Sequence, residues 1–333
     1  MRSFEYRRIE RPEDLSGDRM GALASFIAGG TTLLDLMKLD VMRPTQVLDI
    51  NPLVRFGDFG QIVVEERGAQ LGSLVRMSEA AEHPLLRVAY PVIVQTLNLA
   101  ASQQLRNMAS LGGNVLQRTR CPYFRDTSWK ACNKRVPGSG CAAMEGFNRM
   151  HAVLGGSNAC IATYAGDFGQ ALIALDAEVE VVGPGGRRSF PFAQLHAEPG
   201  ENPHVETSLT DGEVIRAFTI PAGPWTRRST YVKVRDRESY EFALASAAVA
   251  LELDGDSVRE VRIGLGGVAT IPWRAREAEA VLLGKPLNEA NAAAAAEAAF
   301  ARARPREHNA FKVCSARRHW CAPCSRPKQW RFR

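Results

Sequence analysis

The stretch that decides the fold opens with Arg106-Asn-Met-Ala-Ser-Leu-Gly-Gly-Asn114 and ends at Asp167. Between those ends lie four cysteines with 10, 8 and 18 residues in the intervals: Cys121, Cys132, Cys141 and Cys160. Prolines and glycines surround them, and this composition predicts loop, not helix or strand. A long loop without regular structure is uncommon unless something orders it, and four thiolates around one inorganic centre would do so.

Several interpretations of these cysteines compete on the residues alone. Four separate buried thiols are disfavoured because Arg and Lys residues surround the first three. Disulfides suit small secreted domains, and structural zinc usually shows paired ligands at C-x2-4-C spacing, which the loop lacks. Wide, irregular spacing on a loop fits a [4Fe–4S] cluster, which requires only four converging thiolates. Basic neighbours would offset the negative charge of such a cluster.

Length and composition predict an ordinary globular protein. At 333 residues the chain is long enough for two or three domains, and its contents of 45% hydrophobic and 23% charged residues are unexceptional. No apolar run reaches the roughly 18 residues that cross a bilayer, and Met1–Arg8 lacks the apolar core of a secretory signal. We expect no membrane span and a cytoplasmic protein, or a periplasmic one if a signal-bearing partner exports it.

The net charge of +6 does not indicate nucleic-acid binding. Residues 314–333 hold six Arg and Lys residues and no Asp or Glu, and the rest of the chain holds 36 basic and 36 acidic residues. Basicity confined to a tail is not a binding face. The body of the chain is neutral, which argues against a nucleic-acid partner.

Two glycine turns are the strongest candidates for a ligand site. Residues 24–38 predict a short strand, the turn Gly29-Gly-Thr-Thr32 and an amphipathic helix, so that backbone N–H groups can approach an anion closely. The spacing is not a Rossmann fingerprint. A second glycine pair lies within residues 110–114, and the two turns together with Asp167 could surround one dinucleotide. Asp167 could equally cap a helix predicted over 168–175.

The remaining pattern alternates strands and helices. Apolar alternation and turn residues predict strands at 4–9, 46–50, 178–182, 212–220, 229–234 and 258–265, with a hairpin over 60–72. Helical spacing covers 83–107, 272–283 and 287–303, and residues 242–253 fit a strand or a helix. The Pro- and Gly-rich segment 221–225 marks the expected domain boundary.

Five segments carry a family resemblance. They are Phe26-Ile-Ala-Gly-Gly-Thr-Thr-Leu-Leu34, Ala109-Ser-Leu-Gly-Gly-Asn114, Arg118-Thr-Arg-Cys-Pro-Tyr-Phe124, the run from Cys132 to Cys141, and Tyr231-Val-Lys-Val-Arg-Asp-Arg-Glu-Ser-Tyr240. The chain resembles the FAD-binding medium subunit of the molybdenum hydroxylases, the xanthine oxidase family. The cysteine insertion is similar to that of the aldehyde oxidoreductase branch and implies an inserted [4Fe–4S] cluster.

The resemblance implies an α+β fold of the vanillyl-alcohol-oxidase type. Two α+β subdomains would hold FAD between them, and a C-terminal domain would add a three-stranded sheet with helices. The implied bounds are 1–55 and 56–222 for the FAD-binding subdomains, with the cluster loop at 118–162. The C-terminal domain would cover 226–313, and 314–333 would form an aberrant basic tail.

Site residues follow from the same resemblance. The implied FAD-binding residues are Phe26, Ile27, Ala28, Gly29, Gly30, Thr31, Thr32, Leu33, Leu34, Ala109, Ser110, Gly113, Asn114, Asp167, Ile215 and Lys233. The implied cluster ligands are Cys121, Cys132, Cys141 and Cys160. Asp167 would accept from ribityl hydroxyls, Ile215 would pack against the flavin or adenine end, and Lys233 would lie near the isoalloxazine. Without the resemblance, an ion pair of Lys233 with Asp236 or Glu238 is an equal alternative.

The implied function is electron transfer within an oxidoreductase. The chain would be the FAD and [4Fe–4S] subunit of a heterotrimeric aldehyde oxidoreductase, with a large subunit that binds the molybdenum cofactor and a small [2Fe–2S] subunit. Electrons would pass from the small subunit through FAD to an external acceptor, with Lys233 stabilising the reduced flavin. Alternatives are the flavin subunit of an aromatic acyl-CoA reductase and a non-enzymatic metal-cluster protein that binds nucleic acid.

The tail departs from the family pattern. Pro323 and Pro327 would break a helix, and no apolar stripe of helical period is present. We hypothesise that 314–333 is read in a shifted frame. A zinc site built on Cys321 and Cys324 with Cys314 and His319 is the alternative.

Overall fold

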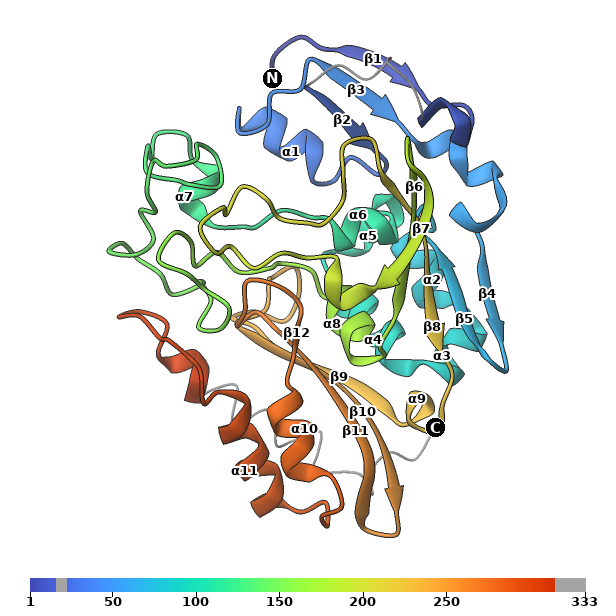
Figure 1. The fold of residues 1–333 in the computed structure, drawn as a ribbon, viewed down its shortest axis with the longest axis vertical. Coiled ribbons are helices and arrows are strands. Elements are labelled where there is room, and N and C mark those ends of the chain that lie inside the picture. The colour runs from blue at the N-terminus through green and yellow to red at the C-terminus, as the bar shows by residue number, and fades with distance from the viewer. Residues whose placement is uncertain (16–22, 315–333) are drawn as a thin grey trace.

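A computed structural model describes residues 1–15 and 23–314, and three sheets with intervening helices organise this part of the chain (Figure 1). The first sheet contains β1 (Glu5–Arg8), β3 (Gln46–Asp49) and β2 (Ala24–Ile27), paired in parallel in that order. Helix α1 (Leu33–Lys38) connects β2 to β3, and its buried face carries Leu33, Leu36 and Met37. These elements agree with the predicted strands, turn and amphipathic helix.

The second sheet is antiparallel with the order β4-β5-β8-β6-β7. Its strands are β4 (Ile62–Glu65), β5 (Gly68–Gly72), β6 (Glu178–Gly183), β7 (Gly186–Pro191) and β8 (Val214–Pro221). The β4–β5 hairpin confirms the one predicted over 60–72, and a second hairpin joins β6 to β7, where Gly186 takes a φ of 90°. In β6 Val179 and Val181 are buried in the main core, while Glu178 is exposed and Glu180 is half-buried, as alternation along a strand requires.

Short helices follow and precede the strands of this second sheet. They are α2 (Met77–Glu82), α3 (Pro84–Ala89), α4 (Pro91–Leu99), α5 (Gln103–Met108), α6 (Leu111–Val115) and α8 (Phe168–Ala174). All but α5, which buries no side chain, contribute to the main core together with the sheet. The prediction of one continuous helix over 83–107 is wrong. Pro91 keeps Tyr90 out of the helical conformation, and Ala101, with φ of 48°, separates α4 from α5.

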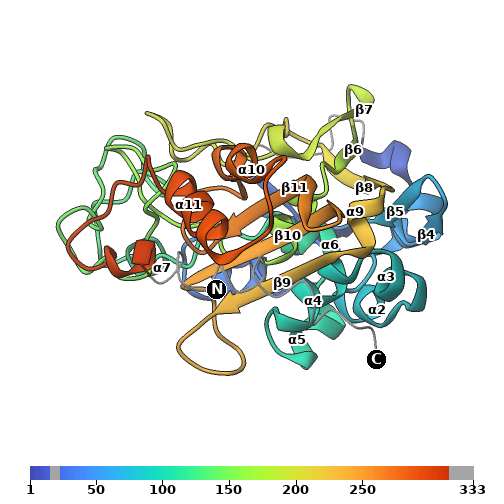
Figure 2. The ribbon, with the colours of Figure 1, turned by 90° about the horizontal axis from the view of Figure 1, so that it is seen from below.

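The third sheet has the order β12-β11-β10-β9. Its strands are β9 (Ser229–Val234), β10 (Ala245–Asp254), β11 (Ser257–Gly266) and β12 (Trp273–Arg274), followed by α10 (Arg276–Leu282) and α11 (Glu289–Ala299). The expected sheet of three strands is therefore wrong, because β12 adds a fourth, and the helix predicted over 272–283 begins only at Arg276. Figure 2 shows α10 and α11 covering one face of this sheet.

Burial explains why the sequence of residues 242–253 fits either a strand or a helix. In β10 the side chains of Ala248 and Ala250 join the main core, while Ala247 and Val249 join the core beneath α10 and α11. A strand buried on both faces shows no polar alternation.

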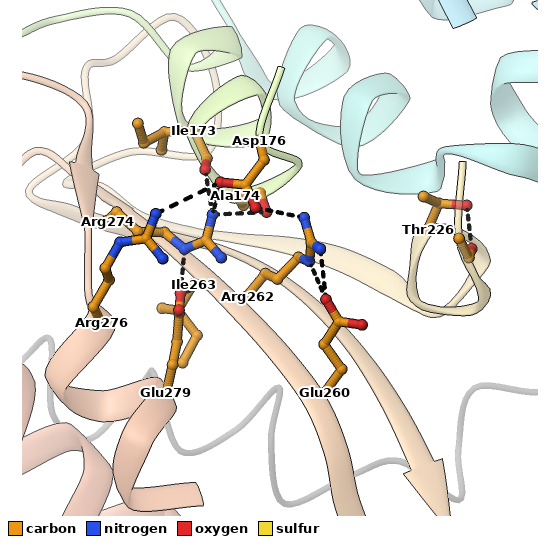
Figure 3. Close-up of polar contacts among 11 residues, drawn as sticks. Ile173, Ala174, Asp176, Thr226, Glu260, Arg262, Ile263, Arg274, Arg276 and Glu279 are labelled. Atoms are coloured by element: carbon orange, nitrogen blue, oxygen red, sulfur yellow. Dashed lines mark hydrogen bonds and ion pairs between the residues drawn. The ribbon is translucent and has the colours of Figure 1, made fainter. Parts of the chain in front are cut away.

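Ion pairs connect the third sheet to the end of α8 (Figure 3). Asp176, which follows α8, accepts from Arg262 of β11 at 2.6 Å and from Arg274 of β12 at 2.7 Å. Arg274 also donates to the carbonyl of Ile173 at 2.7 Å and pairs with Glu279. Arg274 thus satisfies carbonyls at the C-terminal end of α8, and the Asp176 carboxylate connects that end to both strands.

Between α6 and α8 the chain forms the predicted cysteine loop, green at the left of Figure 1. Within 118–162 the only α-helix is α7 (Pro122–Arg125). The remaining short elements of the described chain are α9 (Pro224–Arg227) and the 3-10 turns η1 (Pro12–Leu15), η2 (Asn51–Arg55), η3 (Gly57–Phe59) and η4 (Phe192–Gln194). Among the described residues no helix is both long and apolar enough to cross a bilayer. The tail hypotheses concern residues that lie, from 315 onward, outside the described part.

Candidate functional site

The two glycine turns meet in the structure. A Cβ added at Gly29 would lie 2.1 Å from the carbonyl oxygen of Met108, so the backbone of the first turn touches the end of α5, directly before the second turn. Only glycine permits that approach. Gly30 takes a φ of 73°, which begins the turn into α1.

A cavity of about 390 Å³ lies over this contact. Its lining includes all of the first turn together with Ser110, Gly113 and Ile215. The Ser110 hydroxyl accepts from the Gly113 N–H at 3.2 Å, which orders the second turn. The cavity therefore has a wall of main-chain groups from both turns, a surface suited to phosphate oxygens.

A second cavity of about 560 Å³ continues from the first, because Thr31, Thr32 and Gly113 line both. It extends past Asn114 to Asp167 and Lys233. The amide oxygen of Asn114 is buried and has no hydrogen-bond donor within the described chain. An elongated pair of cavities with phosphate-type contacts at one end and an unpartnered acceptor at the other fits a dinucleotide whose second half carries hydrogen-bond donors.

Asp167 is the centre of the polar contacts at the far end. Its two carboxylate oxygens accept from the Tyr231 hydroxyl at 2.6 Å and from Lys233 Nζ at 2.8 Å. Both donors lie on one face of β9, two residues apart. Burial and then the Asp167 carboxylate raise the pKa of Tyr231 well above its usual value, so its hydroxyl remains a donor.

The structure changes two expectations about these residues. Asp167 stands at the N-cap position of α8, yet its side chain accepts no cap hydrogen bond. Lys233 pairs with Asp167 and not with Asp236 or Glu238, whose partners are Arg149 and Arg235. The ion-pair alternative was therefore right about the type of contact and wrong about the partner.

The FAD-binding residues expected from the sequence gather around the two cavities. Ala28, Leu33 and Ala109 line one or the other, as do the residues named above and Phe26 and Ile27 of β2. Leu34 lines neither; its side chain lies against Gly30 and packs with Leu33 and Met37.

The four cysteines of the loop lie close together. Cys132 and Cys141 face each other in an isolated antiparallel bridge, and the Cys160 thiol donates to the Cys141 sulfur, which lowers the pKa of Cys141 to about 6. Cys121 packs in one apolar cluster with Cys132 and in another with Cys141. Burial raises the pKa of Cys121 to about 12. All four are free thiols, which makes the disulfide interpretation wrong.

The donor set does not suit a single metal ion. Among residues 1–15 and 23–314, no group of three or more His, Cys, Asp or Glu side chains is arranged to hold one. Structural zinc requires four ligands at about 2.3 Å from one ion, and the described residues show no such arrangement. The structure likewise gives no support to the [4Fe–4S] site expected at these cysteines.

The basic residues of the loop bind protein groups. Arg120 and Arg125 pair with Asp35 of α1 at 3.0 and 2.7 Å, and Lys134 pairs with Glu206 at 2.7 Å. Burial raises the pKa of Glu206, but the charges of Arg118 and Lys134 outweigh it and hold that pKa below its ordinary value. The cations thus anchor the loop to α1 and to residues near β8.

Sequence reasoning missed a buried histidine beside Cys121 and a buried lysine that acts on this histidine. His151 Nε2 lies 3.1 Å from Cys121 Sγ, and burial, with a contribution from Lys312, lowers the pKa of His151 to about 4. Lys312 is fully buried, and burial lowers its pKa to about 7. A lone histidine 30 residues from its partner and a lysine near the chain end carry no local signal of such contacts.

Comparison with known proteins identifies relatives along the whole described chain. The family described as the FAD binding domain in molybdopterin dehydrogenase matches residues 14–223, and the CO dehydrogenase flavoprotein C-terminal domain matches 230–317. The aldehyde oxidoreductase FAD-binding subunit PaoB of Escherichia coli is 46% identical over 321 residues, which cover 96% of each chain. The carbon monoxide dehydrogenase medium chain of Hydrogenophaga pseudoflava is 25% identical over 289 residues, 87% of this chain and 82% of that one. A solved structure of the Hydrogenophaga enzyme, lacking the Mo-pyranopterin moiety, superposes with a TM-score of 0.74 over 96% of both chains at 25% identity.

Proposed function

The chain belongs to the family of FAD-binding subunits of molybdopterin dehydrogenases, and on that premise we propose that it is the FAD and [4Fe–4S] subunit of an aldehyde-oxidising complex. A large subunit with the molybdenum cofactor and a small [2Fe–2S] subunit would complete a heterotrimer. Because the family consists of oxidoreductase subunits, it argues against the alternative of a non-enzymatic protein that binds nucleic acid. The 46% identity to an aldehyde oxidoreductase subunit favours aldehydes over aromatic acyl-CoA thioesters.

The observation that carries the FAD half is the contact of the two glycine turns beneath a continuous pair of cavities. Main-chain groups of Gly29–Thr32 would hold the pyrophosphate, and Ser110 and Gly113 would complete that wall. Ile215 would pack against the ring at the adenine end. Asn114, whose amide oxygen lacks a donor, would accept from the flavin half.

Lys233 and Asp167 would position the flavin end of the ligand. The ammonium is buried, held by Asp167 at 2.8 Å and by the Leu99 carbonyl at 3.0 Å, so its location in the cavity wall is tightly defined. Asp167 retains lone pairs after accepting from Tyr231 and Lys233 and can accept from a ribityl hydroxyl. When bound, FAD supplies the capacity to collect single electrons and release two of them to an acceptor.

The cluster half rests on the four free cysteines of one loop, in which Cys132 lies opposite Cys141 and the Cys160 thiol donates to the Cys141 sulfur. A [4Fe–4S] cluster takes four cysteine thiolates and is larger than one ion. Cys121, Cys132, Cys141 and Cys160 would be the ligands. The hydrogen bond to Cys141 and burial raise the pKa of Cys160 above its ordinary value, and the charge of Lys134 offsets only part of that rise.

Cofactor analysis of the purified full-length chain tests both halves. We expect one FAD per chain, flavin absorption bands on a broad iron–sulfur shoulder, and about four iron atoms per chain. Cys141→Ser should lose iron and the shoulder, whereas Cys314→Ser, a change at an exposed cysteine outside the loop, should keep both. Iron-free anaerobic protein, or a Cys141→Ser variant with unchanged iron, would exclude the cluster while leaving the FAD assignment to its own measurement.

A further inference from the structure

A pair of side chains connects the two glycine turns from outside the cavities. Asn51 follows β3, and its Nδ2 donates at 2.9 Å to the carbonyl of Ala28, the residue directly before the first turn. The Asn51 Oδ1 accepts from Arg76 Nη2 at 2.9 Å. Arg76 directly precedes α2, and its Nη1 donates at 2.7 Å to the carbonyl of Met108, the last residue of α5. Asn51 and Arg76 thus form a hydrogen-bonded bridge between the entrance of the first turn and the helix that leads into the second.

The Met108 carbonyl, at one end of this bridge, lies where the two turns meet. The Gly29 backbone approaches the Met108 oxygen so closely that a Cβ at Gly29 would collide with it, and the same oxygen accepts from Arg76. The main chain of Arg76 also pairs with that of Ser110 in an isolated antiparallel bridge. The main chain at Arg76 therefore holds the second turn, while its side chain reaches the segment that carries the first.

Hydrogen bonding fixes the orientation of the Asn51 amide. Its nitrogen donates to the Ala28 carbonyl and also to Asp49 Oδ1, the latter at 2.6 Å, while its oxygen accepts from Arg76. A flipped amide would place its NH2 group against the guanidinium and its oxygen against two acceptors, which removes all three hydrogen bonds. Asp49 is buried at the end of β3, and its Oδ2 accepts from the Tyr6 hydroxyl of β1 at 2.6 Å. The bridge is therefore anchored on the first sheet in one defined geometry.

We propose that Asn51 and Arg76 are positioning residues for the diphosphate of FAD, because they hold the two glycine turns at the spacing at which both face one ligand. This inference rests on the proposed FAD site. Loops that are already ordered bind more tightly, since ordering them at the moment of binding costs conformational free energy. Neither side chain lines either cavity of the site, so both act through the main chain of the turns.

The location of the bridge predicts which part of the ligand depends on it. The turns line the cavity assigned to the diphosphate, whereas Asp167 and Lys233 line the cavity assigned to the flavin half. Loss of the bridge should therefore weaken ligands that carry the diphosphate and spare a flavin that lacks it. A general loss of folding would weaken both kinds of ligand.

Ligand dissection with the full-length chain tests the proposal. FAD-depleted protein is titrated with FAD, with ADP and with riboflavin, which lacks the diphosphate; flavin fluorescence reports FAD and riboflavin, and competition against FAD reports ADP. For Arg76→Met we expect the dissociation constants of FAD and ADP to rise about tenfold, the effect of one lost hydrogen bond of a charged group, and that of riboflavin to stay unchanged. Asn51→Ala should act in the same direction. Arg76→Lys, whose ammonium can reach one of the two acceptors, should recover part of the loss.

Arg55 offers a matched control. Its guanidinium likewise donates to one main-chain carbonyl, that of Pro52, and to one side chain, that of Glu10, but it contacts neither turn. Arg55→Met should leave all three dissociation constants unchanged.

The double variant Asn51→Ala/Arg76→Met tests whether the two residues act as one unit. It should weaken FAD binding by less than the product of the two single effects, because either change alone already breaks the bridge. An effect equal to that product overturns the bridge, as does an unchanged FAD affinity in Arg76→Met or an equal rise for FAD and riboflavin. An unmodified chain that binds no FAD refutes the proposed site itself, and the two failures are thereby distinguished.

Discussion

Replacing Asp167 by alanine removes the single acceptor that serves two buried donors. The side chains of Asp167 and Lys233 are 7% and 1% exposed, and the Tyr231 hydroxyl has Asp167 as its acceptor at 2.6 Å. Breaking a buried ion pair by deleting one partner costs about 3–5 kcal/mol, because the remaining charge stays buried without compensation. That is a large fraction of the roughly 5–15 kcal/mol by which domains are stable.

Urea denaturation followed by tryptophan fluorescence measures this loss. With a slope of about 2–3 kcal/mol per molar urea, the midpoint should fall by roughly 1–2 M, and FAD should be lost during gel filtration. Asp254→Ala removes an exposed carboxylate and serves as the control. The double variant Asp167→Ala/Lys233→Met should lose less than the two single variants summed, because no unpaired charge remains. Strict additivity, or a midpoint equal to that of the unmodified protein, would refute the reasoning.

Three further changes have definite expected outcomes. Gly29→Ala places a Cβ 2.1 Å from the Met108 oxygen and should abolish FAD retention, whereas Gly185→Ala, with nothing within 4 Å, should retain it; equal FAD content in both would contradict the turn contact. A hydrogen bond from Arg188 lowers the pKa of Glu213 to about 2 from 4.5. Its stabilisation is therefore complete above pH 4.5 and lost as the pH falls toward 2, so the urea midpoints of the unmodified protein and Glu213→Gln should converge over that range and stay apart above it. Arg274→Met removes the donor shared by Asp176 and the Ile173 carbonyl and should destabilise the fold by about 2–3 kcal/mol in the same urea assay; no change would show that the network in Figure 3 is energetically neutral.

Local chemistry made the glycine turns and the cysteine loop predictable. Gly29 and Gly30 are followed by an apolar stripe of helical period, and the structure has the turn and α1 where that pattern indicates. The cysteine loop follows from proline and glycine content in the same way. Such features depend on residues within a few positions of one another, which sequence alone displays.

Tertiary contacts decided what the sequence left open or concealed. The strand β10 is buried on both faces, so its alanines show no period. The partner of Lys233 lies 66 residues away, and nearer carboxylates offered equally plausible partners. His151 meets Cys121 across 30 residues, and Lys312 reaches Gly267 across 45. No local propensity encodes these pairings.

The clasp of Asp35 by Arg120 and Arg125 has a consequence for biogenesis. These three side chains also form part of the wall of the cavity proposed for the flavin, so the cysteine loop and the proposed nucleotide site share these ion pairs. Without iron for the proposed cluster, we expect these ion pairs not to form in a newly synthesised chain. On the proposed assignment we expect the cluster to be inserted before FAD binds, and subunit purified from iron-depleted cells to contain less FAD as well as less iron.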